Sequence, residues 1–84
     1  MSRVAVMAII VENTDSADAL NSLLHDYQDI IVGRMGIPYH PKHISIMSVA
    51  VDAPQDRISA LSGKIGKLPG VSVKTAYSNI TGEE

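Results

Sequence analysis

Apolar residues form four short runs along the chain, each of a length typical of a β-strand. Residues 3–11 and 44–52 are apolar at nearly every position, which predicts central strands covered on both faces. Residues 30–36 and 71–77 include polar side chains such as Arg34, as is typical of strands at the edges of a sheet. The pattern therefore predicts four strands, with the first and third at the centre.

Two further segments carry apolar residues at helical spacing. Residues 15–27 place them on one stripe, and Asp15 is a suitable N-cap. A second helix is predicted to open after Asp52, with Pro54 in its first turn and a capping box between Asp52 and Gln55. Each predicted helix thus lies between two predicted strands.

An internal repeat supports this order of elements. Residues 4–12 and 44–52 match position by position at an offset of forty, and each segment is followed by a helix and a strand. Two such halves are the plan of the ferredoxin-like βαββαβ fold, an α+β class. We expect one domain over residues 1–78, with an antiparallel sheet of order 4-1-3-2, two helices on one face and a flexible tail at residues 79–84.

That arrangement leaves one face of the sheet without helices. In the first strand, Val4, Val6 and Ile10 would point one way and Met7, Ile9 and Val11 the other, so the open face is apolar whichever set it carries. An apolar patch of more than a few hundred Å² usually marks an interaction site. We therefore expect a homo-oligomer, a dimer or a tetramer, in which a second copy covers the open face.

Composition narrows the classes of function. The 84 residues include no Cys, which excludes disulfides and thiol chemistry, and no cofactor is expected. The net charge of −2 and the lack of a basic cluster argue against direct nucleic-acid binding. No apolar run reaches the roughly 20 residues that span a bilayer, and no signal-peptide cleavage site follows the first residues, so we expect a cytoplasmic protein without membrane contact.

The most unusual stretch is residues 33–39. Two glycines in a short strand often mark a bulge or a close backbone approach. Arg34 suits a carboxylate or phosphate, and an aromatic ring can stack on a ligand or partner. The candidate contact residues here are Gly33, Arg34, Met35, Gly36 and Tyr39. The alternative is an edge strand that bends into a turn with a solvated Arg34.

A second candidate contact lies late in the second helix, at Ser62, Gly63 and Lys64. Glycine inside a helix costs about 1 kcal/mol relative to alanine, so a neighbouring subunit or a small ligand would explain it. The alternative, slightly favoured, is a helix that terminates with Gly66 at its C′ position.

Metal binding and catalysis find little support. His40 and His43 have a spacing that suits a metal, but no Cys or H-E-x-x-H motif accompanies them, and two exposed loop histidines are the favoured interpretation. His25 lies on a polar helix face and is expected to be exposed. Carboxylates near the helix starts are explained by capping, so no catalytic residue is predicted.

Two segments, VGRMGIPYHPKHISI and DAPQDRISALSGKIGKLPGVSVKTAYS, resemble the small regulators associated with the iron-only hydrogenase system. The resemblance covers residues 4–78. It implies a βαββαβ fold similar to ACT domains and to the C-terminal domain of nickel-responsive repressors, and a role in hydrogenase maturation or expression. Where those repressors carry His and Cys ligands, this chain has Gly36, Pro38 and Ile44, and the DNA-binding arm is missing, so a transcriptional role would need a partner.

The leading hypothesis is therefore a non-enzymatic regulatory module that senses a small-molecule effector or a protein partner as a homo-oligomer. One alternative is a small dimeric ferredoxin-like enzyme with monooxygenase-type chemistry, which would need a deep cavity with a polar group aimed into it. The other is an assembly protein with no ligand.

Overall fold

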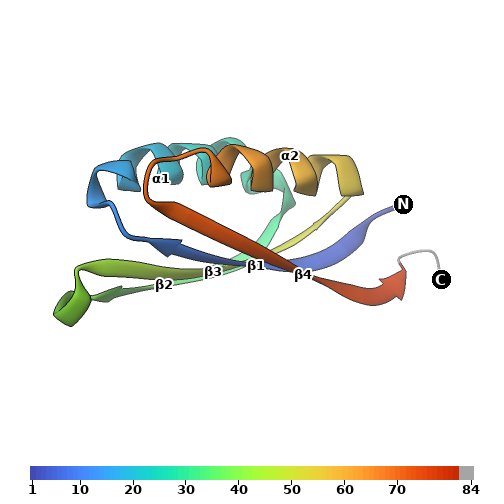
Figure 1. Cartoon of the computed structure of the whole chain (residues 1–84). Coiled ribbons are helices and arrows are strands. Elements are labelled where there is room, and N and C mark those ends of the chain that lie inside the picture. The colour runs from blue at the N-terminus through green and yellow to red at the C-terminus, as the bar shows by residue number, and fades with distance from the viewer. Residues whose placement is uncertain (82–84) are drawn as a thin grey trace.

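The computed structural model describes residues 1–81 and contains four strands and two helices. In chain order, these are β1 (Arg3–Val11), α1 (Ala17–Asp26), β2 (Ile31–Tyr39), β3 (Ile44–Ala53), α2 (Gln55–Gly66) and β4 (Val71–Thr81). The strands form one antiparallel sheet of order β2-β3-β1-β4, and both helices lie on the same face of it (Figure 1). The predicted ferredoxin-like fold and strand order are confirmed.

The core lies between the sheet and the helices. In β1 every second residue points towards the helices, and Met7 and Ile9 are completely buried. The same register places Val49 and Val51 of β3 beside them. The helices contribute one stripe each: Leu20, Leu24, Ile58, Leu61 and Ile65. Because side chains alternate along the strands and recur at helical spacing along the helices, the apolar side chains of the sheet and of both helices form one layer.

Both predicted helix starts are wrong in detail. Residues 14–16 form a 3₁₀ turn capped by the Asn13 side chain, which accepts a hydrogen bond from the Asp15 N–H at 2.9 Å, so Asp15 is not the N-cap and α1 begins at Ala17. At the second helix, Pro54 lies at the N-cap position rather than in the first turn. Gln55 bonds Arg3, Ser59 and Tyr77 instead of forming a capping box.

Both edge strands are longer than predicted. β2 runs to Tyr39 and includes Pro38, because an edge strand tolerates a residue that lacks an N–H. β4 continues past Tyr77 to Thr81, where it pairs with Arg3. The predicted tail at residues 79–84 therefore begins inside a strand, and residues 82–84 lie outside the described residues.

The register of β2 contains one irregularity. Ile31 pairs with Val51, but the next pair joins Gly33 to Ala50, so Val32 is an extra residue. Such a β-bulge shifts the alternation of all later side chains by one position. Arg34 consequently pairs with Val49 and points to the helix side of the sheet. The bulge predicted as one interpretation of the two glycines is present.

Candidate functional site

The sheet face opposite the helices is apolar across three strands. Ile37 of β2 pairs with Ile46 of β3, which pairs with Ile10 of β1, so three isoleucines form a row across the sheet. Their side chains are 52%, 40% and 41% exposed, respectively. The row ends at Ser72 of β4, next to exposed Lys74, so the β4 edge of this face is polar.

Four more exposed apolar side chains lie on the same side of the sheet. We use the name open apolar face for the set Val4, Val6, Ile10, Met35, Ile37, Tyr39 and Ile46. The prediction that the three β1 residues share one side of the sheet is confirmed. The β2 members could not be placed from the sequence, because their side depends on the bulge at Val32.

A shallow hollow interrupts the open apolar face beside the bulge. It has a volume of about 250 Å³ and lies over Gly33, with Val6 and Met35 in its wall. A Cβ atom added at Gly33 would meet nothing within 4 Å, so the missing side chain itself leaves this space. Gly36 is not a close approach either, since a Cβ there would be 3.7 Å from the Met47 side chain.

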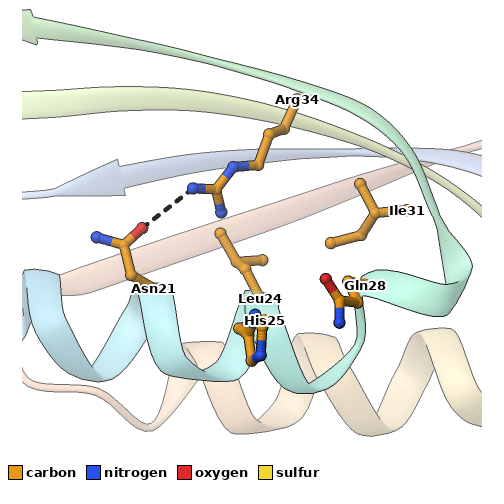
Figure 2. A pocket seen from close by; sticks show the side chains of 6 residues that line it. All are labelled: Asn21, Leu24, His25, Gln28, Ile31 and Arg34. Carbon is orange, nitrogen blue, oxygen red and sulfur yellow. Dashed lines mark hydrogen bonds between the residues drawn. The ribbon is translucent and has the colours of Figure 1, made fainter.

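A larger pocket of about 480 Å³ lies on the helix side, between α1 and β2. In Figure 2, Asn21 and Leu24 point from α1 towards the Arg34 guanidinium, with His25 and Gln28 along the helix. Among the six side chains drawn there, one hydrogen bond is present, a long one of 3.4 Å from the Arg34 guanidinium to the Asn21 side-chain oxygen. We call this the Arg34 pocket; it is lined by Asn21, Leu24, His25, Gln28, Ile31 and Arg34.

The sequence identified Arg34 but missed the other polar residues of this pocket. The pattern predicts a polar helix face for Asn21 and His25 and assigns no role to Gln28, although their spacing of four and three residues is the signal that places all three on one stripe. The alternative interpretation agrees with the structure as well, because β2 is an edge strand that leads into the turn at residues 40–42, and Arg34 is exposed.

The second candidate contact, in α2, lies apart from the candidate contact around Arg34. Ser62, Gly63 and Lys64 line neither the Arg34 pocket nor the hollow on the open face. Lys64 donates a hydrogen bond to the Tyr27 hydroxyl at 2.9 Å and so links α2 to the end of α1. Gly63 faces open space in this chain, and Gly66 is the last helical residue rather than the C′ residue.

The two loop histidines lie at the tip of the β2–β3 hairpin. Residues 40–42 form a 3₁₀ turn, and the N–H of His43, in the left-handed region at φ 55°, donates to the carbonyl of His40 at 3.1 Å. Within residues 1–81, no group of three or more His, Cys, Asp or Glu side chains could hold a metal ion together. The hairpin thus offers no third ligand from the described part of the chain.

One ion pair is present among the described residues, between Arg57 of α2 and Asp29 of the turn before β2. The hydrogen bond from Arg57 lowers the pKa of the Asp29 carboxyl, and the same bond raises the pKa of Arg57. Arg57 also lies over the Tyr27 ring, 5.4 Å from its centroid. Arg34, in contrast, has no carboxylate partner in this part of the chain.

An antiparallel sheet of order β2-β3-β1-β4 with two helices on one face defines a ferredoxin-like α+β domain. Within residues 1–81, neither helix has the length and apolar character needed to cross a bilayer.

The chain belongs to the family described as "TM1266-like: Iron-only hydrogenase system regulator, putative", whose model matches residues 3–75. A solved structure of the uncharacterized protein TM1266 from Thermotoga maritima is similar at a TM-score of 0.88 and 32% identity, over 92% of this chain and 98% of that one. No curated protein matches.

More distant structures share the fold alone. A formyltetrahydrofolate deformylase from Pseudomonas putida KT2440 has a TM-score of 0.65 at 8% identity, and the match covers 92% of this chain but 29% of the deformylase. A functionally unknown protein from Pediococcus pentosaceus ATCC 25745 has a TM-score of 0.62 at 13% identity, over 100% and 99% of the two chains.

Proposed function

We propose that this protein is a non-enzymatic, cytoplasmic regulatory module of the iron-only hydrogenase system, which senses a small molecule or a protein partner as a homo-oligomer. Membership of the TM1266-like family supports the regulatory role. A role in transcription would be exercised through a DNA-binding partner, because the chain has a net charge of −2 and no basic cluster.

The open apolar face is the observation that carries the oligomer. Three isoleucines in a row and four flanking apolar side chains are exposed on one side of a single sheet. Leaving this surface in water is unfavourable by roughly 25 cal/mol for each Å² of apolar area. A second copy related by a two-fold axis would cover it with the same set of residues, since a two-fold interface is self-complementary.

The size of the face fits such a dimer. Nine-residue strands, such as β1 and β2, are about 30 Å long at about 3.3 Å per residue, and the helix-free side of the whole sheet, with its polar β4 edge included, is about 19 Å wide at the usual strand spacing. That flat area is on the order of 500–600 Å², and the shape of the side chains adds to it. A stable interface buries about 800 Å² per partner, so the area approaches the usual size. The hollow over Gly33 provides a recess for a side chain of the partner.

Light scattering coupled to size-exclusion chromatography tests this arrangement. The variant Ile46→Lys places a charge at the centre of the row and is expected to convert the oligomer to a monomer, because an unpaired charge in an apolar interface is costly to desolvate. Ala60→Lys is the matched control: it adds the same charge on an exposed position of α2, on the other side of the sheet, and should leave the mass unchanged.

The regulatory role has its own readout. In cells that make an iron-only hydrogenase, replacing the gene with Ile46→Lys should change hydrogenase activity as a deletion does, whereas Ala60→Lys should behave as wild type. A wild-type protein that is monomeric at micromolar concentration contradicts the oligomer. Unchanged hydrogenase activity in the deletion strain contradicts the assignment to this system.

A further inference from the structure

The Arg34 pocket combines a fixed positive charge with several side chains that can donate hydrogen bonds, and no acidic residue lines it. We propose that it binds a small molecule through a carboxylate or phosphate group, held by the guanidinium of Arg34. This inference names the chemistry of the effector in the proposed function. It rests on the proposed function only where binding is taken to have a regulatory effect.

The hydrogen-bonding capacity of Arg34 is largely unused. A guanidinium offers five N–H donors in a planar fork that matches a carboxylate or phosphate. Arg34 directs one long bond, 3.4 Å, to Asn21. Arg57 shows the opposite situation, because two of its guanidinium nitrogens donate to Asp29. Of these two arginines, Arg34 is therefore the one with an open fork.

The surroundings of Arg34 fit an anion with a compact apolar part. Asn21, His25 and Gln28 line the helix side of the pocket and add polar groups within its wall (Figure 2). Leu24, which is buried, and Ile31, which is half-buried, supply apolar surface between them. A few polar groups that converge over an apolar floor are typical of small-molecule sites.

The carboxylates nearest to the pocket on α1 lie next to it but do not line it. Asp18 and Asp26 line a separate pocket of about 410 Å³, which shares Asn21 and His25 with the Arg34 pocket but does not include Arg34. The volume of the Arg34 pocket, about 480 Å³, lies within the roughly 300–1,000 Å³ of small-molecule sites. The pocket is therefore large enough for a small anionic molecule.

The backbone explains how Arg34 comes to be there. The extra residue Val32 turns Arg34 to the helix side, opposite Val49, whereas regular alternation from Ile31 would have placed it on the open apolar face. The bulge thus brings the guanidinium over the exposed stripe of α1. Bulges often reorient one side chain at a functional site.

Two-dimensional ¹H–¹⁵N NMR tests the site on the full chain, with inorganic phosphate and acetate titrated separately. We expect saturable shifts of the Asn21 and Gln28 side-chain amides and of the Arg34 Nε–H. Saturation by phosphate but not acetate assigns a phosphate group to the effector, the reverse assigns a carboxylate, and saturation by both assigns an anion held by charge and the guanidinium fork.

Arg34→Gln should weaken binding by about tenfold or more, because it removes charge-assisted hydrogen bonds. Arg57→Gln is the matched control and should bind as wild type, since that arginine is already paired. Asn21→Ala, which alters the pocket from the helix side, gives a second variant should Arg34→Gln fail to fold.

Either of two results overturns the inference: no saturable shift with phosphate or acetate, or an equal loss of binding in Arg34→Gln and Arg57→Gln. Light scattering on the same samples separates this inference from the proposed function. A protein that is oligomeric but binds neither anion would contradict the inference about the Arg34 pocket and would leave the proposed oligomer intact.

Discussion

At the scale of single residues, Gly70 and Gly63 illustrate two different uses of glycine. Gly70 lies in the turn before β4 with φ +69°, and a Cβ atom there would lie 2.5 Å from the Cβ of Asn13. Its carbonyl also accepts a hydrogen bond from the Glu12 N–H at 2.7 Å. Gly63 lies inside α2, where an added Cβ would meet nothing within 4 Å.

Alanine substitution should therefore act in opposite directions at these two positions. Gly70→Ala is expected to lower the free energy of unfolding by about 1–3 kcal/mol, because the side chain meets both a strained φ and the backbone of Asn13. Gly63→Ala should raise it by up to about 1 kcal/mol through helix propensity. Denaturant unfolding at one protein concentration measures both, and equal effects of the same sign would contradict the structural assignment.

The residue scale also shows what the sequence can say about the site. The two glycines around Arg34 predict a bulge in this segment, and a bulge is present at Val32. The exposure of His25 gave no such signal, since a helix face that borders a pocket has the same polarity as one that faces bulk water. Its position beside the pocket depends on how β2 lies relative to α1, which the sequence alone does not show.

At the scale of elements, an ion pair joins α2 to the turn that leads into β2. Asp29 in that turn accepts hydrogen bonds from Arg57, and this lowers the pKa of its carboxyl. A group whose pKa is lower in the folded than in the unfolded chain stabilises the fold above its ordinary pKa, about 3.9 for Asp. That contribution is lost as the pH falls from about 4 through the lower folded value.

Asp29→Asn should accordingly remove part of the acid sensitivity of the fold. Relative to wild type, the variant is expected to lose stability at pH 7 and to show a flatter dependence between pH 5 and pH 2, and Arg57→Gln should do the same; the window lies around and below the ordinary Asp pKa of about 3.9. Glu12→Gln is the control, because Glu12 forms no ion pair in the described residues. Parallel curves for wild type and Asp29→Asn across this range would show that the pair does not contribute.

The bounds of an element follow from the sequence where its own residue pattern determines them. They do not follow where pairing with a neighbouring element determines them. The starts of β1 and β3 follow from their apolar runs, and the structure begins both strands at the predicted residues, Arg3 and Ile44. β2 was ended too early because Gly36 and Pro38 are unfavourable in strands, yet pairing along β3 extends it to Tyr39. The predicted helix caps differ from the structure because Asn13, and not Asp15, accepts the N–H bond before α1, and because no side chain caps α2, which begins after Pro54.

At the scale of the whole molecule, a chain of 84 residues has a small core. Domains of this size bury only about 60–65% of the surface exposed by the unfolded chain, and association is a common source of additional stability. Here the helices bury one side of the sheet, and the open apolar face is uncovered in the single chain. In the proposed oligomer, a second copy covers this face. Folding and assembly should therefore be linked.

This linkage predicts a melting temperature that depends on protein concentration. Because only the folded state associates, raising the concentration of wild-type protein should raise Tm by mass action. Ile46→Lys should melt at one temperature over the same range, and Ala60→Lys should follow wild type. Differential scanning calorimetry over a hundredfold range of concentration makes this measurement, and a constant wild-type Tm would argue against coupled assembly.

The extra residue in β2 ties together two surfaces that lie on opposite sides of the sheet. Val32 shifts the phase of the strand, so that Arg34 faces α1 while Met35, Ile37 and Tyr39 lie on the open apolar face. A related chain with one residue fewer at this point would have to exchange polar for apolar residues at every later position of the strand to keep both surfaces. In alignments of such chains, a gap at this position should be accompanied by an exchange of polar and apolar residues along the rest of the strand. A gap without that exchange would mark a relative that has lost one of the two surfaces.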